Sequence, residues 1–252
     1  MTDETGPRRT KVQQIVEELK AAIERGDYQP GDRLPGETAL AAQHGVAGLT
    51  ARRALKVLHT EGLVESKKGA GARVLDFRLI RRRGIPRLAN DQWGSGRSIW
   101  SADDDRAPGV DQISVDENSA SPDHVSSVLQ LADGDTVCVR TRRYVMEGRP
   151  VMLAVSYLPQ SVVAGSPITR ADTGPGGIYA RLADLGHAPV RFREEIRVRL
   201  PSADEANRLS IPADRAVIKL ARTAFDANGR AVEVNEMTMD SAAYVLEYDF
   251  DA

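Results

Sequence analysis

The stretch from residue 28 to residue 74, YQPGDRLPGETALAAQHGVAGLTARRALKVLHTEGLVESKKGAGARV, decides the fold of the first part of the chain. A short helix is expected to begin near Gly36, to end before a turn at Gly45, and to be followed by a second helix over 48–61. Two short helices around a tight glycine turn favour a helix-turn-helix, whose second helix enters the major groove of DNA. Four residues of that helix are expected to face inward: Leu49, Ala54, Leu55 and Leu58.

The sequence on either side of the two helices extends this pattern. Over 12–24 apolar residues recur at spacings of three and four, which predicts a helix that docks on the other two. Strands are expected over 62–65 and 72–75, around a basic, glycine-rich tip that is typical of a DNA-contacting wing. The contacts expected there are those of Lys67 and Lys68 with phosphates and of Gly69 and Gly71 with the edge of the minor groove.

The charge of the chain is divided unevenly. The net charge is −2 overall. Through Arg87 there are 17 Lys and Arg against 11 Asp and Glu, a net charge of +6, whereas the remainder carries 17 against 25, a net charge of −8. A basic segment of this size suits a polyanionic partner, although a solvated charged surface would give the same count.

Length and composition exclude several other classes of protein. A chain of 252 residues fits two domains, and 41% hydrophobic residues without a long apolar run argue against a membrane span. The polar start MTDETGPRRTK does not read as a secretory signal, so we expect a cytoplasmic protein. The single cysteine, Cys138, lies in the apolar run VCV and is expected to be buried.

The stretch 28–74 resembles the winged helix of the GntR family of bacterial regulators along its whole length. The resemblance lies in the PGDRLP element, the T-x-R-R-A-L helix, and the EGLV and GAG segments of the hairpin. In that family the arginine of the first element, the T-x-R-R positions and the glycines of the wing contact DNA. Carried over residue by residue, these contacts are Arg33, Thr50, Arg52, Arg53, Gly69 and Gly71.

Two positions depart from the family pattern. The family usually has a serine after the proline and a Ser-Arg pair before the recognition helix, where this chain has Gly36 and Ala47-Gly48. Losing that arginine removes a guanine contact that can be worth about 1–3 kcal/mol, so the operator is expected to differ from the usual one. We expect Arg52 to contact a base or a phosphate, and Arg53 either to do the same or to form a structural ion pair.

The middle of the chain is expected to connect two domains, one over 10–75 and one over 113–252. The intervening 76–112 begins with an arginine cluster and continues rich in Gly, Ser and Asp, which predicts a linker. Its arginines either contact phosphates or remain solvated. Trp93 and Trp100 are more often packing anchors than platforms for a ligand.

The second domain is expected to be an α+β domain built on an antiparallel sheet. Alternating segments joined by hairpin signals such as Glu147-Gly148-Arg149 indicate the sheet, and a few helices interrupt them. Strands are expected over 113–115, 136–146, 150–158, 192–200, 217–226, 232–238 and 243–250, and helices over 122–131, 177–185 and 203–209.

This order resembles the UTRA ligand-sensing domain of the HutC subfamily of GntR regulators, which has a chorismate-lyase-like fold. The segments that carry the resemblance are DGDTVCVRTRRYVMEGRPVMLAVSYLP, GGIYARLADLGH and DANGRAVEV. The resemblance implies a homodimer that binds double-stranded operator DNA, most simply as a repressor. It also implies that the affinity for the operator changes when a small polar metabolite occupies this domain. It implies no cofactor and no metal.

Six residues are the expected effector contacts: Arg142, Tyr144, Gly176, Gly177, Thr238 and Tyr244. Arg142 matches one of two alternate arginines in sugar-phosphate sensors of the family, but Tyr144 and Ala154 replace the second arginine and a glutamate, which argues against a phosphorylated amino sugar. Gly176 and Gly177 open a helix whose free N–H groups could receive an anion, or they simply form a turn. Thr238 and Tyr244 match further lining positions of the family.

Two other functions remain open on the sequence alone. One is a constitutive DNA-binding or plasmid-control protein whose second domain only dimerises. The other is a lyase-like enzyme, but no G-x-S-x-G element or phosphate-binding loop is present, and the four histidines lack metal-ligand spacing. Among the histidines only His187 is expected near the ligand site, and a histidine at a helix end is the more common reading.

Overall fold

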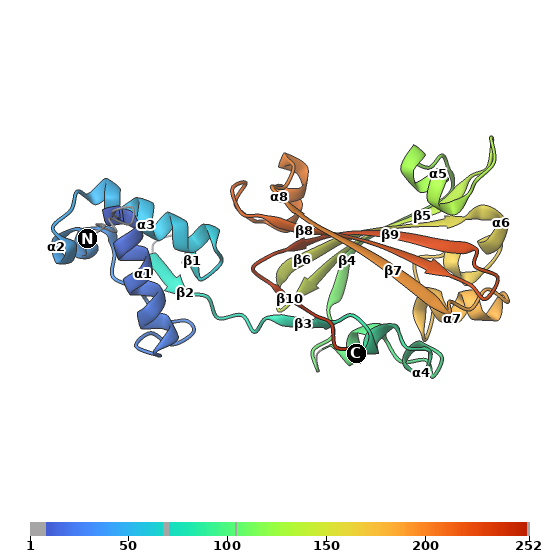
Figure 1. The fold of residues 1–252 in the computed structure, drawn as a ribbon, viewed down its shortest axis with the longest axis horizontal. Coiled ribbons are helices and arrows are strands. Elements are labelled where there is room, and N and C mark those ends of the chain that lie inside the picture. The colour runs from blue at the N-terminus through green and yellow to red at the C-terminus, as the bar shows by residue number, and fades with distance from the viewer. Residues whose placement is uncertain (1–8, 68–70, 104, 251–252) are drawn as a thin grey trace, which may run out of the picture. The chain divides into compact units, whose positions relative to one another are not determined.

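The computed structural model describes residues 9–67, 71–103 and 105–250. The chain forms two compact units, which we call the N-terminal unit (1–78) and the C-terminal unit (79–252) (Figure 1). The first is helical with a hairpin, and the second is built on a large sheet.

Three helices and one hairpin make up the N-terminal unit. The helices are α1 (Lys11–Glu24), α2 (Glu37–His44) and α3 (Gly48–Thr60). Helix α1 begins with a reciprocal cap between Thr10 and Gln13, and α2 ends at Gly45, whose φ of 60° suits glycine. The shared core has these buried residues: Ile15, Val16, Leu19, Leu34, Leu40, Ala51, Ala54, Leu58, Val64, Ala72 and Val74.

The hairpin is formed by β1 (Val64–Lys67) and β2 (Gly71–Val74), which pair antiparallel. The 31–34 segment lies along β2, with hydrogen bonds from Leu34 N to Ala72 O (2.9 Å) and from Val74 N to Asp32 O (2.9 Å). The predicted contacts Lys68 and Gly69 lie outside the described residues. The wing is therefore anchored to the segment that carries Arg33.

The predicted inward position of Leu49 is wrong. Its side chain is 56% exposed, whereas Ala54 and Leu58 are fully buried and Leu55 is partly buried against the core. Leu49 lies in the first turn of α3, and the residues of α3 that are buried in the core are Ala51, Ala54 and Leu58. An apolar side chain is thus presented to solvent at the beginning of the expected recognition helix.

The C-terminal unit is built on a six-stranded antiparallel sheet in the order β4-β5-β6-β9-β8-β7. Its strands are β4 (Gly109–Ser119), β5 (Val137–Met146), β6 (Arg149–Pro159), β7 (Arg191–Arg199), β8 (Val217–Phe225) and β9 (Ala231–Asp240). The α+β architecture predicted from the alternating segments is confirmed. Successive side chains point to opposite faces, so each strand contributes to two different environments.

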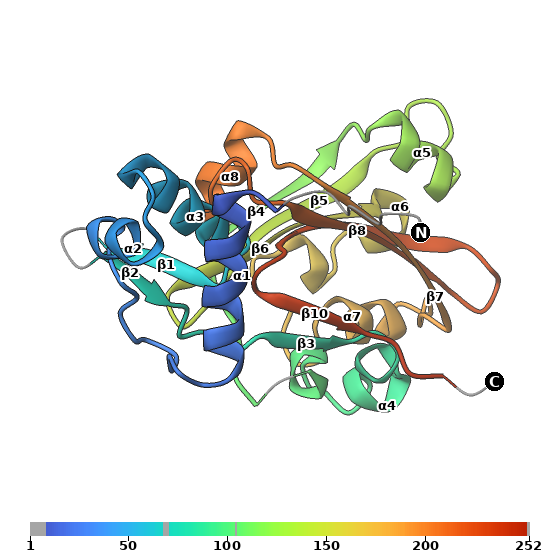
Figure 2. The same cartoon turned by 60° about the vertical axis from the view of Figure 1, so that its left-hand side comes forward.

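Helices cover both faces of this sheet (Figure 2). On one face, α5 (Asp123–Leu129) packs against β9 and α8 (Ala203–Leu209) against β6. On the other face, α7 (Gly177–Asp184) and α6 (Gln160–Val163) enclose a core that includes fully buried Cys138, as predicted. The short η3 (Pro167–Thr169) lies beside α7. This second face carries the cavity described below.

The structure differs from the linker expected over 76–112. Strand β3 (Ile80–Arg83) pairs in parallel with β10 (Tyr244–Glu247), and then follow η1 (Pro86–Leu88), α4 (Asn90–Trp93) and η2 (Ile99–Ala102). We call residues 79–103 the entry segment, because it directly follows the N-terminal unit and packs within the C-terminal one.

Buried ion pairs fix the entry segment in the C-terminal unit. The arginine cluster is only partly solvated, because Arg82 pairs with Glu194 and Arg87 with Asp103, and both arginines are almost completely buried. Trp93 is a packing anchor in the core, as expected, whereas Trp100 is buried but also lines the cavity described below. A local charge pattern cannot reveal a partner that lies 112 residues away, as Glu194 does from Arg82.

Candidate DNA interface and ligand cavity

The two arginines of α3 have different surroundings. Arg52 donates from Nε to both carboxylate oxygens of Glu37 on α2, at 3.0 and 2.9 Å, and these bonds lower the pKa of Glu37. Arg53 is exposed and has no ion pair or side-chain hydrogen bond within the described part of the chain. The ion pair considered for Arg53 is therefore made by Arg52, and Arg53 is the arginine whose donors are all available.

Arg33 and Gly71 lie together at the base of the wing. Gly71 has a φ of +77°, and a methyl group placed on it would lie 3.4 Å from Nε of Arg33. The neighbouring Arg73 donates to the carbonyl of Gly31 at 2.8 Å, which holds the turn before Arg33 against β2. Glycine thus leaves room for an exposed guanidinium beside the hairpin, next to the expected minor-groove contact.

Helices α2 and α3 both begin without a side-chain cap. The N-cap residues are Gly36 for α2 and Ala47 for α3, and neither accepts a hydrogen bond from the first turn with its side chain. These are the positions at which the sequence departs from the family pattern. Because Ser is among the preferred N-cap residues, the departure also has a structural consequence for the ends of these helices.

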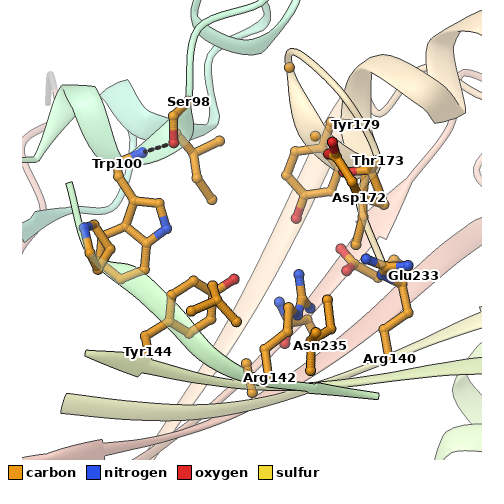
Figure 3. A pocket seen from close by; sticks show the side chains of 18 of the residues that line it. Ser98, Trp100, Arg140, Arg142, Tyr144, Asp172, Thr173, Tyr179, Glu233 and Asn235 are labelled. Carbon is orange, nitrogen blue, oxygen red and sulfur yellow. Dashed lines mark hydrogen bonds between the residues drawn. The ribbon is translucent and has the colours of Figure 1, made fainter. Parts of the chain in front are cut away.

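The C-terminal unit holds a cavity of about 640 Å³ between the sheet and the layer formed by the entry segment and α7. Figure 3 shows its polar floor and its aromatic side wall. The lining includes Arg87, Ser98, Trp100, Arg140, Arg142, Tyr144, Ala154, residues 171–179, Arg222, Glu233, Asn235 and Met237.

Arg140 shapes one wall of the cavity. Its guanidinium donates to the backbone carbonyls of Ile168 and Arg170, and to that of Ala171 at 2.9 Å. The 168–171 segment leads directly into the loop before α7, so a strand side chain holds the loop in place. Arg140 is 2% exposed, and its Nε has no acceptor among the described residues.

Several buried polar atoms face the cavity without a partner in the described part of the chain. They are Nε and Nη1 of Arg222, Oε2 of Glu233, Oδ1 of Asn235, the hydroxyl of Tyr179 and Nε of Arg142. Arg222 is 3% exposed and Glu233 is 1% exposed. Although burial lowers the pKa of Arg222, the neighbouring Tyr179, Glu233 and Glu194 outweigh it and hold that pKa above its ordinary value. Buried polar groups normally have partners, so this concentration marks a binding site.

An aromatic pair forms the side of the cavity opposite Tyr179 (Figure 3). The rings of Trp100 and Tyr144 lie 5.2 Å apart at 44°, and the guanidinium of Arg87 lies 5.1 Å from the centre of the Trp100 ring. Burial lowers the pKa of Arg87 to about 10. Arg142 donates to the hydroxyl of Ser156 and lies 6.0 Å from the ring of Tyr144. Arg142 and Tyr144, which were both predicted to contact the effector, thus both lie on the face of the sheet that lines the cavity.

Gly176 and Gly177 line the cavity, and of the two readings considered for them the geometry matches the turn rather than the anion site. The amide of Gly176 donates to Gly96 O (3.1 Å) and that of Gly177 to Gly174 O (3.2 Å), so neither N–H is free for an anion. The position of Gly176 requires glycine, because a side chain would lie 2.7 Å from Trp93 O at a φ of +77°. These glycines allow the entry segment and α7 to approach closely.

Thr238 and Tyr244 do not line the cavity. Thr238 lies on the opposite face of the sheet from Glu233, Asn235 and Met237, because its position on β9 has the other parity; there it donates to Glu205 (3.1 Å) and accepts from Lys219 (3.0 Å). Tyr244 is buried in β10 beside β3, and burial raises its pKa. Neither residue is among those that line the cavity.

Sequence reasoning missed most of the charged lining. Arg140, Arg222, Glu233 and Asn235 come from three strands that are far apart along the chain. One signal was present, since Glu233 and Asn235 are polar residues at alternate positions of the VEVNEM run, in which Glu236 is the third polar residue. Polar residues on one face of a strand whose other neighbours are buried indicate either a network or a binding site.

Other kinds of site find little support. Among the described residues, no three His, Cys, Asp or Glu side chains are grouped so as to hold a metal ion. His187 follows α7 and lies 2.9 Å from Asp226, away from the cavity lining. Among the described residues, no helix has the length and apolarity that a membrane span requires.

Comparisons with known proteins match both units. Residues 11–74 match the family model for bacterial regulatory proteins of the gntR family, and residues 103–245 match the UTRA domain. An uncharacterised HTH-type transcriptional regulator of Streptomyces coelicolor is 30% identical, over 97% of this chain and 94% of its own. The HTH-type transcriptional repressor NagR of Bacillus subtilis is 26% identical, over 87% and 86%.

Solved structures share the fold over the whole chain. PhnF from Mycobacterium smegmatis superposes with a TM-score of 0.56 and 24% identity, covering 94% of this chain and 99% of its own. A crystal structure assigned to the GntR family of transcriptional regulators gives a TM-score of 0.63 at 22% identity, covering 97% and 98%. The relatives named here are regulators, which disfavours the enzyme alternative. This chain therefore belongs to the GntR family of transcriptional regulators, with a ligand-binding UTRA domain behind its helix-turn-helix.

Proposed function

We propose that this regulator is a cytoplasmic, homodimeric repressor whose affinity for its operator changes when a small polar molecule enters the cavity of the C-terminal unit. The observation that supports this proposal is the position of the entry segment. Residues 79–103 follow the N-terminal unit without interruption and supply Arg87, Ser98 and Trp100 to the cavity wall. A ligand that contacts this wall acts on the segment from which the DNA-binding unit leaves.

The entry segment can transmit such a contact because it is internally braced. Gln92 donates to Ser98 O (2.8 Å) and to the hydroxyl of Ser101 (2.6 Å), and Gly96 accepts from Gly176 N at the start of α7. A ligand-induced displacement of Trp100 would therefore be transmitted through these hydrogen bonds to α4 and to the loop before α7. Coupling of this kind needs a ligand that binds one arrangement of the wall better than another.

The DNA contacts are proposed from the exposed arginines of the N-terminal unit and from the partly exposed Thr50. Arg53 and Thr50 stand on α3, which would enter the major groove, and Arg33 stands at the base of the wing. Arg52 joins them either through its remaining donors or by exchanging Glu37 for a phosphate. The wing would contribute Lys67, Lys68, Gly69 and Gly71.

Dimerisation follows from the geometry of operators. Two half-sites about one helical turn apart need two helix-turn-helix units at a fixed spacing. A ligand that changes this spacing would change the affinity for the operator without contacting DNA. The dimer contact is proposed for the C-terminal unit.

The test is fluorescence anisotropy on DNA from upstream of the gene, at several salt concentrations, followed by titration with separate carboxylated, phosphorylated and neutral metabolites. We expect salt-sensitive, competitor-resistant binding that an Arg52→Ala, Arg53→Ala double variant loses. At least one metabolite should change the affinity of the wild type, and a Trp100→Ala variant should bind DNA but no longer respond. A protein that binds metabolites with unchanged operator affinity would instead be the constitutive DNA-binding alternative.

A further inference from the structure

We infer that the ligand of the cavity is a small organic carboxylate that also carries a hydroxyl or ammonium donor and an apolar or planar part, and that it is not a phosphate ester. This inference rests on the proposed function, since it names the chemistry of the molecule that would act as the effector. It is carried by the unpartnered atoms of the cavity rather than by the relatives.

The cavity floor has an excess of positive charge. Three buried or half-buried guanidinium groups, those of Arg140, Arg142 and Arg222, face one buried carboxylate, that of Glu233, and the exposed carboxylate of Asp172 at the rim. The fourth arginine of the lining, Arg87, already has Asp103 as its partner. Because Nε and Nη1 of the buried Arg222 guanidinium have no acceptor among the described residues, the ligand is expected to supply a negative, hydrogen-bond-accepting group near Arg222.

The remaining unpartnered atoms require the opposite chemistry. Oδ1 of Asn235 is an acceptor without a donor among the described residues, and Oε2 of Glu233 has none within hydrogen-bond geometry, although the Glu233 carboxylate lies close enough to the Tyr179 hydroxyl to help raise its pKa. Figure 3 shows both side chains on the floor between the arginines and Tyr179. Burial raises the pKa of Tyr179 well above its ordinary value, so its hydroxyl stays protonated. A ligand hydroxyl or ammonium group would satisfy these acceptors, which a simple anion cannot do.

A phosphate ester fits this set of groups poorly. A dianionic phosphate would place its second charge in the cavity that also holds the unpartnered Glu233 carboxylate. The amides of Gly176 and Gly177, which would receive phosphate oxygens at the beginning of α7, already donate to backbone carbonyls. Arg140 is committed to three carbonyl oxygens. A carboxylate needs fewer donors and brings one charge.

The side wall indicates what lies next to the carboxylate. Trp100 and Tyr144 form a continuous aromatic surface, extended by the apolar Met237 and Ala154 on the floor. Rings and the apolar faces of sugars both pack on such surfaces. The ligand would therefore combine a charged end at Arg222, a donor at Glu233 and an apolar face at Trp100.

The experiment uses ring compounds that differ in one group at a time. Benzoate, benzamide and phenyl phosphate share the ring and differ in the head group, whereas 2-, 3- and 4-hydroxybenzoate add a donor at different positions. Binding to the full chain is followed by Trp fluorescence and by the midpoint of thermal unfolding. We expect benzoate to bind at least ten-fold more tightly than benzamide or phenyl phosphate, and at least one hydroxybenzoate to bind more tightly than benzoate.

Two variants locate the binding. Arg222→Lys keeps the charge and should weaken benzoate binding at least ten-fold. Glu233→Gln should reduce the advantage of the best hydroxybenzoate over benzoate while leaving benzoate binding within about three-fold. Far-UV circular dichroism checks that both variants are folded, and Arg81→Lys on the exposed side of β3 serves as a matched control that should bind like the wild type.

The opposite outcomes are distinct. No binding of any carboxylate up to tens of millimolar, equal or tighter binding of phenyl phosphate, or benzoate binding that Arg222→Lys leaves unchanged would each overturn the inference. A carboxylate that binds as expected with no change in operator affinity would leave the inference standing and contradict the proposed function. A phosphorylated metabolite that releases DNA would do the reverse.

Discussion

The two units of this regulator handle charge in opposite ways. In the N-terminal unit the side chains expected to meet DNA are exposed, as Arg33 and Arg53 are, whereas in the C-terminal unit the groups that face the cavity are buried, with Arg222 at 3% and Glu233 at 1% exposure. DNA is large and brings its own charges to a solvated surface, so the protein need not desolvate its arginines in advance. A small ligand must be enclosed, so the protein holds unpaired charges in its interior.

Within the C-terminal unit, a second comparison separates buried arginines that have partners from buried arginines that lack them. Arg82 and Arg222 are both almost completely buried, and Nε of each has no partner among the described residues, but the terminal nitrogens of Arg82 are held by Glu194 and Tyr248 while Nη1 of Arg222 has no partner there. The first arginine holds the entry segment on the sheet, and the second faces the cavity. Burial alone therefore does not tell a structural arginine from a binding one.

The largest effect is expected from Arg82→Met. This change leaves the Glu194 carboxylate buried without its ion-pair partner, which should lower the free energy of unfolding of the C-terminal unit by about 3–5 kcal/mol. Urea denaturation of the full chain, followed by Trp fluorescence and circular dichroism, measures it. The control is Arg81→Met, whose exposed pair with Glu247 should change stability by less than about 1 kcal/mol. Equal effects of both changes would remove the distinction between buried and exposed charge in this protein.

A large effect on DNA binding, with none on stability, is expected from Arg53→Ala. Loss of an exposed arginine that contacts a base should weaken specific binding by about 1–3 kcal/mol, and loss of a phosphate contact should reduce the salt dependence by about one ion. Anisotropy titrations at four salt concentrations distinguish the two. Arg25→Ala, in an exposed pair with Asp27 after α1, is the matched control and should bind DNA normally. If the control weakened binding as much as Arg53→Ala, the α3 interface would be contradicted.

These contrasts also explain what the sequence could predict. The helix-turn-helix and wing are continuous in sequence, so short-range periodicity located α2, α3 and the hairpin within a few residues. The cavity is assembled from the entry segment, three strands and the loop before α7, and its charged lining depends on strand register. Arg142 and Tyr144 were found because alternation on one strand is visible, but Thr238 was placed on the wrong face. The linker over 76–112 was misread because Arg82 meets its partner only through the fold.

A smaller gain in stability is expected from Ala47→Ser. Ala47 is the N-cap of α3 with φ −67° and ψ 148°, a conformation in which a serine hydroxyl can accept from the first turn. The change should stabilise the N-terminal unit by about 1 kcal/mol, whereas Gly36→Ser at the N-cap of α2 should contribute only a few tenths. Thermal unfolding followed by circular dichroism checks both. A destabilising effect of Ala47→Ser would show that Ala47 is constrained by something other than helix capping.

The smallest expected effect is a loss of folding stability at low pH. It arises from Glu205, which lies on the face of the sheet opposite the cavity. Glu205 accepts from Arg199, from Ser202 N and from Thr238, and its pKa is lowered to about 2, with the hydrogen bond from Arg199 as the main cause. Because the folded pKa lies below the unfolded one, the stabilisation is present above about pH 4.5 and is lost as the pH falls from there toward 2. Because the partner side chain of Arg199 is exposed, solvent screens the pair and the effect should remain small. Urea midpoints between pH 7 and pH 3 should fall less for Glu205→Gln than for the wild type, and identical slopes would show that Arg199 and Glu205 do not form the pair in solution. The cavity ligand should bind Glu205→Gln normally, since Glu205 and Thr238 lie on the opposite face of the sheet from Glu233 and Asn235.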